Sequence, residues 1–554
     1  MRSTMQDVPL SIATIVRYGT TVHGAAEVIT STGDGTRRAT YAEVGRRAAQ
    51  LANALRGLGI TGDQRVGTFM WNNQEHLEAY LAVPAMGAVL HTLNVRLFPD
   101  QLAYVIDHAD DMVVLADGSV LPLLAKVLAQ TPSVQHVVVN GPADLSVLDG
   151  FDVQVHSWDE LIAGQPDSFD WVEVDERDAA AMCYTSGTTD NPKGVAYSHR
   201  SIYLHSMQVC MGDGFTLNAR DKVLAVVPMF HAMAWGLPYA ALMVGSSLIM
   251  PDRFLMPEPL AALIAAEQPT VAGAVPTIWT ALLTELDKQA ELGTPIDVSS
   301  LRDVVVGGSA CPPALMRAFD ERHGVHITHA WGMTEISPLG SVGQLPANVE
   351  GERAWAYRET QGRLVAGVQG RLVAPDGTFA PHDGESVGEV EIRGPWTTAS
   401  YYRDDDPERF HDGWLRTGDV GSITPDGFLT LTDRSKDVIK SGGEWISSVH
   451  LENALMGHPA VAEASVIGVP DEKWGERPLA TVVVRDGEQV EVDELRTFLA
   501  GKVASWQLPE RWAFIAEVPK TSVGKFDKKV LRRQYAAGDL SVQTTTPAGS
   551  GVSP

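Results

Sequence analysis

Short apolar runs alternate with longer amphipathic stretches over roughly the first four hundred residues of the chain. Residues 65–70 (RVGTFM), 112–117 (MVVLAD) and 301–310 (LRDVVVGGSA) have the length and apolar content of buried strands. Residues 40–59 (TYAEVGRRAAQLANALRGLG) read as a helix. This alternation predicts an α/β fold with largely parallel sheets in a large, multi-layer domain.

The pattern changes near residue 387, where short β segments and turns begin, as in GEVEIRG, GWLRTGD and TPDGFLTLTDRSKD. The last part of the chain then reads as helix, two strands, helix and strand, which predicts a small α+β domain. We expect a large domain over 1–433 that ends in a β-rich subdomain, a linker over 434–437 and the small domain over 438–537. The polar stretch 538–554 predicts a disordered tail.

One apolar segment, 223–250, contains no Asp, Glu, Lys or Arg and is long enough to cross a bilayer. Pro228, His231, Gly236 and Pro238 interrupt it. A short buried strand, a loop and a packed helix therefore fit it better, and we predict no integral membrane segment.

The composition of the chain limits the classes of partner and the cellular compartment that we expect. A chain of 554 residues exceeds one hydrophobic core, and its net charge of −26 argues against nucleic acid or an anionic membrane surface as the main partner. Its three cysteines lie far apart and form no C-x-x-C. The apolar stretch near the N-terminus is broken by Arg17, a poor match to a signal peptide. These features predict a cytoplasmic protein.

Residues 184–194 (YTSGTTDNPKG) combine four hydroxyl side chains, glycines and one lysine. These groups can hold a phosphate, although Gly194 after Lys193 rules out the G-x-x-x-x-G-K-[ST] pattern. The flanking runs AAAMCY and GVAYS read as strands, so no helix N-terminus is available to bind the phosphate. A hairpin without a ligand is the alternative.

Further motifs follow in a fixed order: VVPMFHAMAW, VVVGGSA, AWGMTE, GWLRTGD, DRSKDVIKSGGEWIS and PKTSVGK. With TSGTTDNPKG they resemble the signatures of the adenylate-forming superfamily over nearly the whole chain. The sequence is most similar to bacterial medium- and long-chain fatty acyl-CoA synthetases in PMFHAMAW, SGGEWISS, LENALMGHPAV and WQLP. Asp190 stands where many relatives have glycine, and Trp331 replaces the commoner tyrosine.

The resemblance implies a two-step reaction in which a carboxylate attacks ATP to give acyl-AMP and CoA then displaces AMP. The implied substrates and cofactors are a fatty acid, ATP, Mg²⁺ and CoA. The implied catalytic residues are Lys525, Glu335, Thr334 and His231, with Glu335 as the Mg²⁺ ligand. The implied ATP and AMP site comprises Thr185, Ser186, Gly187, Thr188, Thr189, Lys193, Gly307, Gly308, Ser309, Trp331, Gly332, Met333, Asp419 and Arg434.

The chemistry of these residue types is consistent with those roles. Lys525 can bridge the carboxylate and the α-phosphate, and Asp419, which accepts hydrogen bonds only, suits a ribose diol. Five basic residues around Lys525 are opposed in the local sequence only by Asp527, which predicts a positive local potential or a solvated helix face: Lys520, Lys528, Lys529, Arg532 and Arg533.

The remaining roles concern the acyl group, CoA and domain motion. The resemblance implies that Trp235 gates the acyl tunnel, although core packing explains an apolar tryptophan equally well, and His231 also fits a buried core histidine. It implies a hinge at Lys436 that lets the small domain rotate. The implied CoA path comprises Lys440, Gly442, Gly443, Glu444 and Trp445.

The sequence therefore predicts an ATP-dependent medium- or long-chain fatty acid:CoA ligase acting on small molecules. An aryl- or short-chain acyl-CoA ligase is the alternative within the superfamily. A non-catalytic acyl or nucleotide binder is disfavoured by intact Lys525, Glu335 and Lys193. An acyl-AMP ligase that delivers to a carrier protein is disfavoured because no insertion precedes the linker. The sequence leaves open whether the protein forms a homodimer.

Overall fold

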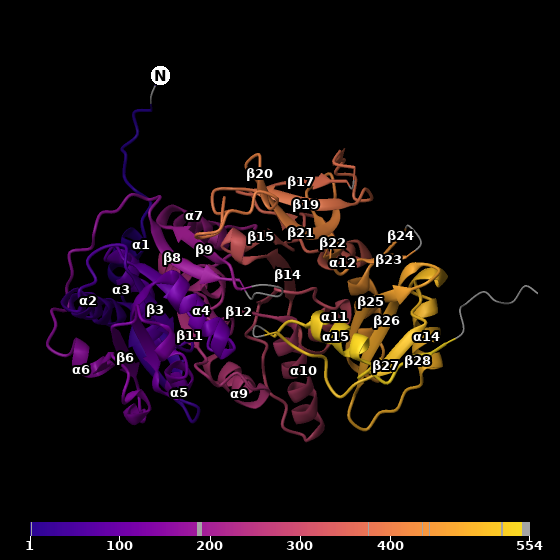
Figure 1. The fold of residues 1–554 in the computed structure, drawn as a ribbon, viewed down its shortest axis with the longest axis horizontal. Helices are drawn as coiled ribbons and strands as arrows, with labels where there is room; N and C mark the ends of the chain where they lie inside the picture. The colour runs from indigo at the N-terminus through magenta and orange to yellow at the C-terminus, as the bar shows by residue number, and fades with distance from the viewer. Residues whose placement is uncertain are drawn as a thin grey trace, which may run out of the picture.

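We analysed a computed structural model of the chain, which describes residues 1, 3–185, 191–374, 376–434, 436–441, 444–521 and 524–545. Two mixed α/β sheets form the large domain, a β-rich subdomain lies at its edge, and the C-terminal domain packs against it (Figure 1). The predicted α/β fold class is confirmed.

The first sheet contains the two strands that flank the predicted phosphate loop and five strands that come before them in the sequence. Its strand order is β7 (Gln154–Ser157), β6 (His136–Asn140), β5 (Asp111–Asp117), β3 (Arg65–Phe69), β4 (Val89–Thr92), β8 (Ala179–Tyr184) and β9 (Gly194–Ser198). All neighbouring pairs are parallel except β8 and β9, which pair antiparallel with Tyr184 opposite Gly194. The loop that joins two strands in the sequence therefore lies at the tip of a hairpin.

The second sheet combines strands that follow the loop with two strands from the start of the chain. Its order is β16 (Arg363–Leu364), β15 (Leu339–Val342), β14 (Ile327–Gly332), β13 (Asp303–Val306), β12 (Val271–Ala274), β10 (Lys222–Ala225), β11 (Ser247–Met250), β1 (Glu27–Ser31) and β2 (Thr36–Thr40). The strands from β14 to β1 are parallel. The carboxyl ends of β13 and β14 therefore meet at one edge, where ligands bind in open α/β sheets.

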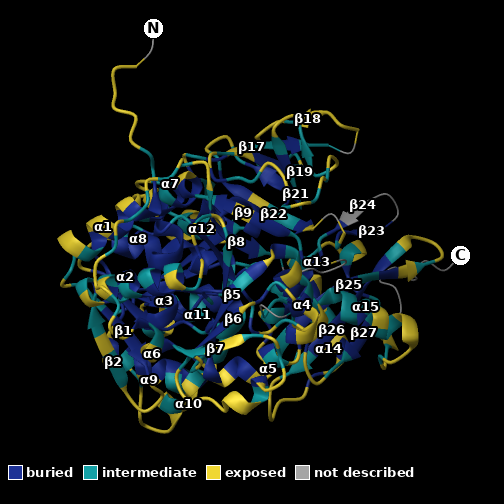
Figure 2. Cartoon of the chain, turned by 60° about the vertical axis from the view of Figure 1, so that its left-hand side comes forward, coloured by how far each residue is buried: buried dark blue, intermediate teal, exposed yellow. Residues whose placement is uncertain are grey.

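Helices lie between the two sheets and on their outer faces. The bounds are α1 (Ile12–Val22), α2 (Tyr41–Gly57), α3 (Gln74–Ala85), α4 (Pro99–Ala109), α5 (Leu121–Ala125), α6 (Trp158–Ile162), α7 (His199–Cys210), α8 (Leu237–Val244), α9 (Pro257–Glu267), α10 (Pro276–Glu291), α11 (Pro313–His323) and α12 (Gly351–Arg358). Every residue of α3 is buried, and α3 and α8 share one hydrophobic core with strands of both sheets. Figure 2 shows this buried interior beneath exposed loops.

The apolar segment 223–250 folds as the sequence predicts. It gives the buried strand β10, a loop, the packed helix α8 and the strand β11. Within the described ranges, no helix has both the length and the apolarity that crossing a membrane requires. Its lack of charge is explained by burial between the sheets, where an unpaired charge is costly.

The β-rich subdomain is antiparallel. It comprises β17 (Gln369–Val373), β18 (Phe379–Ala380), β19 (Gly388–Arg393), β20 (Phe410–His411), β21 (Trp414–Ile423) and β22 (Leu429–Arg434). Asp419 on β21 pairs in register with Arg434, the last residue of β22. The strand register thus brings together two residues that the sequence placed in different motifs.

The C-terminal domain has its own sheet and core. It comprises β23 (Ile439–Ser441), β24 (Glu444–Ile446), α13 (Ser448–Met456), β25 (Val461–Asp471), β26 (Gly475–Val484), α14 (Val492–Ala500), β27 (Arg511–Phe514), α15 (Lys528–Ala537) and β28 (Gln543–Thr544). The predicted disorder of 538–554 is wrong for its described part, because β28 pairs with the edge of β27. The backbone N–H of Thr545 also donates to the Glu510 carbonyl at 2.9 Å.

Candidate functional site

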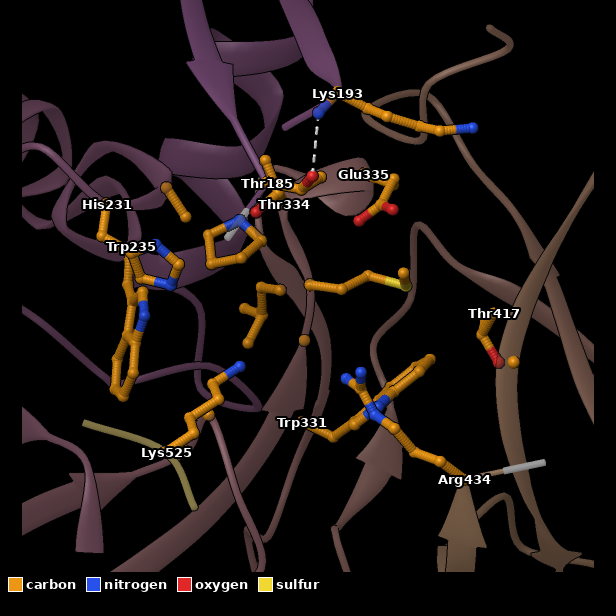
Figure 3. A pocket seen from close by; sticks show the side chains of 18 of the residues that line it. Thr185, Lys193, His231, Trp235, Trp331, Thr334, Glu335, Thr417, Arg434 and Lys525 are labelled. Carbon is orange, nitrogen blue, oxygen red and sulfur yellow. Dashed lines mark hydrogen bonds between the residues drawn. The ribbon is translucent and has the colours of Figure 1, made fainter. Parts of the chain in front are cut away.

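A cavity of about 400 Å³ lies between the two α/β sheets, the β-rich subdomain and the C-terminal domain (Figure 3). A second cavity of about 630 Å³ continues from it along the domain interface and adds Ser309 and Asp419 to the lining. The predicted site residues that line the first are Thr185, Lys193, His231, Trp235, Gly307, Gly308, Trp331, Gly332, Met333, Thr334, Glu335, Arg434, Lys436 and Lys525.

The two ends of the predicted phosphate loop are held by the hairpin. The Thr185 N–H donates to the Lys193 carbonyl at 2.9 Å, and the Lys193 N–H donates to Thr185 Oγ1 at 3.1 Å. Ser186, Gly187, Thr188, Thr189 and Asp190 lie outside the described residues. The contribution of the loop's central hydroxyls therefore stays a prediction.

The Lys193 ammonium is paired within the protein. Its Nζ lies 3.2 Å from carboxylate oxygens of both Asp404 and Asp406, and 4.8 Å from the centre of the Tyr401 ring. Burial alone would lower the pKa of Lys193, but these ion pairs outweigh it and raise the pKa. Figure 3 shows the amino group pointing away from the centre of the cavity. A phosphate would have to compete with two carboxylates for it.

Lys525 enters the same cavity from the C-terminal domain (Figure 3). The preceding Gly524 carbonyl accepts a 3.5 Å hydrogen bond from Thr277 at the start of α10. Gly308 has φ +83°, and a Cβ there would lie 3.5 Å from the Lys525 side chain. Desolvation, helped by the charge of Arg434, lowers the pKa of Lys525 to about 8 despite the nearby Asp419 and Glu335.

Trp331, Asp419 and Arg434 form a hydrogen-bonded group near Lys525. The Trp331 indole N–H donates to Asp419 Oδ2 at 2.8 Å, and Arg434 Nε lies 3.3 Å from Asp419 Oδ1. Asp419 is buried, and its carboxylate raises the pKa of Arg434. Trp331, which stands in place of the commoner tyrosine, thus donates a hydrogen bond that holds the Asp419 carboxylate in position. The sequence showed only an aromatic residue at this position and did not predict this hydrogen bond.

Thr334 and Glu335 lie immediately after β14, and their backbone is fixed by neighbouring elements. Tyr197 donates its hydroxyl to the Thr334 carbonyl at 2.6 Å, and the Glu335 carbonyl accepts from Thr398 N–H at 2.8 Å. The Glu335 carboxylate is buried and accepts hydrogen bonds at Oε1 from Tyr401 Oη (2.7 Å) and Arg409 Nη2 (3.1 Å).

The sequence analysis missed the segment that surrounds Glu335 and Lys193. Its cavity-lining residues are Tyr401, Asp406 and Arg409. The signal was the run SYYRDDDPERF, in which an aromatic pair precedes three acidic residues and an arginine. This run contains no glycine, lysine or threonine of the kind that marks the other motifs, so its role became visible only through its contacts.

His231 and Trp235 line the apolar end of the cavity. Burial lowers the pKa of His231 to about 3, so its imidazole is neutral at pH 7. The Trp235 side chain belongs to the main hydrophobic core and also faces the cavity, next to Gly273 and Gly307. Both interpretations of Trp235 are therefore compatible with its position.

The backbone that carries Trp235 is strained. Residues 232–235 all have positive φ, between 43° and 57°, followed by Gly236 at 75°. Such a left-handed turn costs roughly 1–2 kcal/mol for each non-glycine residue. Backbone strain of this kind is found mainly at active sites, at ligand-binding sites and in segments that change conformation.

Carboxylates from other elements pair with three of the five basic residues around Lys525, and a net positive potential there stays a prediction. Lys528 lies 2.9 Å from Glu452 on α13, and Lys520 lies 2.6 Å from Glu463 on β25. Arg532 pairs with Asp437 at 2.8 Å. Local sequence shows only Asp527, whereas folding brings in acids from positions 57 to 95 residues away.

Lys436 lines both cavities at the domain junction, and its carbonyl accepts from Arg532 at 3.4 Å. Lys440, on β23, lines neither cavity, and its N–H donates to Glu476 at 2.9 Å. Gly442 and Gly443 lie outside the described residues, as do the side chains of Glu444 and Trp445. Lys440 is thus the one predicted CoA-path residue whose side chain is described, and the path as a whole stays a prediction.

The donor set fits a divalent cation bound together with phosphates rather than by protein alone. Glu335 is a buried carboxylate at the cavity wall next to Thr334. Among the described side chains, no group of three or more His, Cys, Asp or Glu could hold a metal ion. One carboxylate plus substrate phosphates is a usual Mg²⁺ environment.

Comparison with known proteins agrees with this geometry. The AMP-binding enzyme family matches residues 19–402, and the AMP-binding enzyme C-terminal domain matches residues 450–525. A solved anthranilate CoA ligase bound to anthranoyl-AMP has the same fold, with a TM-score of 0.86, 27% identity and coverage of 97% of this chain and 100% of that one.

Several relatives match almost end to end. A 3-methylmercaptopropionyl-CoA ligase of Ruegeria lacuscaerulensis is 43% identical over 97% of this chain and 99% of its own length. A medium-chain fatty acid CoA ligase of Ectopseudomonas oleovorans is 42% identical (97% and 98%), and a long-chain fatty acid CoA ligase of Thermus thermophilus is 43% identical (96% and 97%). The predicted superfamily is confirmed: the chain belongs to the AMP-binding enzyme family, in its branch of acyl-CoA ligases.

Proposed function

We propose that this enzyme activates a medium- or long-chain fatty acid with ATP and transfers the acyl group to CoA, with Mg²⁺ as cofactor. The observation that carries the proposal is the position of Lys525. Its side chain, from the C-terminal domain, enters the cavity that Glu335, Thr334 and Trp235 also line. This arrangement suits the first half-reaction, in which one positive charge must meet two anions.

In that step a carboxylate oxygen forms a bond to the α-phosphorus, and the bond from this phosphorus to the pyrophosphate oxygen breaks. Lys525, protonated below pH 8, is suited to hold the carboxylate and the α-phosphate together. The neutral imidazole of His231 can face them without adding charge. Mg²⁺, when held by Glu335 and the phosphates, supplies further charge neutralisation.

The adenine and ribose of the nucleotide would lie on the side of the cavity that Trp331 and Asp419 line. Gly307, Gly308, Trp331 and Gly332 offer a narrow slot for adenine, and Asp419 retains acceptor capacity for the ribose diol. Ser309 and Met333 extend this lining. The loop residues Thr185 and Lys193 would contact the phosphates.

In the second step the CoA sulfur bonds to the acyl carbon and AMP leaves. Lys440 lies away from the cavity, so a rotation of the small domain (438–537) about the linker 434–437 would be needed to present the CoA path. Lys436 is the proposed hinge. This division into two conformations explains how one cavity can serve two reactions.

The end of the cavity that His231 and Trp235 line, here called the acyl end, favours an apolar substrate. Besides the neutral imidazole of His231, the lining there includes apolar side chains: Phe215, Ala232, Trp235, Pro338 and Leu339. An alkyl chain would be desolvated there without leaving a buried polar group unpaired. The named activities of two relatives support fatty acids, and the 3-methylmercaptopropionyl relative, equally similar, supports a short thioether acid as the second candidate.

Pyrophosphate release distinguishes these substrates. Straight-chain acids from C4 to C18, 3-methylmercaptopropionate and benzoate should be compared by kcat/KM at fixed ATP and CoA. We expect the highest value at eight carbons or more. A preference for the thioether acid, a short acid or benzoate would overturn the fatty-acid assignment, and no release with any acid would overturn the ligase activity.

We also infer a cytoplasmic location, and whether the chain assembles into homodimers is a separate, testable property. Three thiol cysteines support a reducing, cytoplasmic environment, and cell fractionation tests it. A homodimer is tested by light scattering of the purified protein.

A further inference from the structure

Arg409 is a cavity-lining cation that no motif of the sequence singled out. It precedes β20, and its backbone is fixed on both sides: its N–H donates to Asp406 Oδ1 at 3.1 Å, and its carbonyl accepts from Arg416 N–H at 2.9 Å. The guanidinium therefore extends from a firmly held position toward Glu335.

The hydrogen bonds of this guanidinium are incomplete. Nη2 donates to Glu335 Oε1 at 3.1 Å and to the Thr417 carbonyl at 3.4 Å. Nε is buried and has no hydrogen-bond partner among the described residues. A buried donor without a partner costs free energy, and an arginine presents its donors in a fork that matches phosphate oxygens. The arrangement is suited to an arriving oxyanion.

The cations Lys193 and Arg409 at this end of the cavity are each paired with carboxylates of the protein. Lys193 is paired with Asp404 and Asp406, and Arg409 is paired with Glu335. Three carboxylates thus face two cations, an arrangement that would repel a polyphosphate as it stands. Binding requires at least one cation to exchange its carboxylate for a phosphate.

The opposite end of the cavity is chemically different. Figure 3 places Glu335 and Lys193 at one end and Lys525, Trp331 and Arg434 at the other. If adenine and ribose occupy the Trp331 end, the β- and γ-phosphates extend toward Glu335. Arg409 then lies on the side of the leaving pyrophosphate rather than of the acyl group.

We propose that Arg409 binds the β- and γ-phosphates of ATP, and hence the departing pyrophosphate, by exchanging Glu335 for phosphate oxygens. This inference rests on the proposed function. Because the Glu335 carboxylate is also the group suited to Mg²⁺, its pairing with Arg409 opposes both phosphate and cation binding until the two arrive together. Arg409 thus couples nucleotide binding to release of the metal-binding carboxylate.

The test is equilibrium binding to the purified full-length enzyme in EDTA, measured by calorimetry with inorganic pyrophosphate, ATP and AMP as separate probes. Arg409→Gln should weaken pyrophosphate and ATP binding about tenfold or more and leave AMP binding within about twofold. Arg416→Gln is the matched control, because Arg416 carries the same charge nearby but pairs with Glu389 outside the cavity. It should bind all three probes like the wild type.

Glu335→Gln tests the exchange itself. Removing the carboxylate that competes for Arg409 should tighten pyrophosphate binding in EDTA, although the same variant should respond less to added Mg²⁺. Unchanged or weaker pyrophosphate binding by Glu335→Gln would refute the exchange.

The outcomes separate a phosphate ligand from a merely structural ion pair. If Arg409 only positions Glu335, Arg409→Gln will leave pyrophosphate binding in EDTA unchanged and alter only the Mg²⁺ dependence, which refutes the proposal. Equal loss of AMP and pyrophosphate binding would refute it as well, since it would indicate damage to the whole site. These measurements need no fatty acid, so they stand even if the acyl substrate is assigned wrongly.

Discussion

The pH dependence of adenylation offers a direct test of Lys525. The structure places its ammonium in a desolvated cavity beside Arg434, which lowers its pKa to about 8. Only the protonated form can neutralise the two anions of the first step. The adenylation rate should therefore be high below pH 8 and fall as the pH rises through the pKa.

The magnitude follows from the titration. With a pKa of about 8, roughly nine-tenths of Lys525 is protonated at pH 7 and roughly one-tenth at pH 9. We expect kcat/KM for adenylation to fall about tenfold between these values, because kcat/KM reports the free enzyme. The assay is pyrophosphate release with octanoate and subsaturating ATP, without CoA so that the thiol does not contribute.

Lys525→Arg is the control for this assignment. Arginine stays protonated throughout this range, so the variant should be slower but lose the decline above pH 7. Lys525→Ala should lose about 10²-fold or more in adenylation while still transferring the acyl group from supplied acyl-AMP to CoA. A decline that persists in Lys525→Arg, or a flat wild-type profile, would show that another group titrates.

Substitutions at three further positions test the nucleotide slot, the acyl end and the linker. Trp331→Phe keeps an aromatic face but removes the 2.8 Å hydrogen bond to Asp419, so KM for ATP should rise about tenfold while the order of acyl preferences is kept; an unchanged KM would contradict this. Trp235→Ala should change chain-length preference more than KM for ATP, and equal effects on all acids would favour a core role alone. Lys436→Pro should form acyl-AMP but transfer it slowly to CoA in single-turnover measurements, whereas Lys436→Ala should act like the wild type; equal slowing of both steps would exclude a hinge there.

Several parts of the site were predictable because their signals are local. The hairpin around residues 184–194 is specified by two short apolar runs that flank glycines and hydroxyls, and β8 and β9 form as expected. Glu335 and Lys525 were found because each lies in a short motif. Their convergence on one cavity was expected only through family resemblance, and the structure places both in it.

Other features depend on residues distant in sequence and gave no local signal. Lys528 is unremarkable in its own helix, yet folding places it 2.9 Å from Glu452. The strand β28 looked like a polar tail because its pairing partner, β27, lies about thirty residues earlier and offers an unpaired edge. Propensity cannot reveal a strand whose stability comes from another strand's backbone.

The sequence by itself determined the alternation of strands and helices and the burial of the uncharged segment 223–250, because both follow from periodicity and composition. Its short motifs, through their resemblance to a known family, pointed to many of the residues that line the first cavity. Only the tertiary structure decided which polar groups pair: Arg409 with Glu335, Lys193 with two aspartates, and Trp331 with Asp419. Pairing depends on distances of a few ångströms between segments far apart in sequence, and Coulomb and hydrogen-bond energies fall steeply beyond such distances.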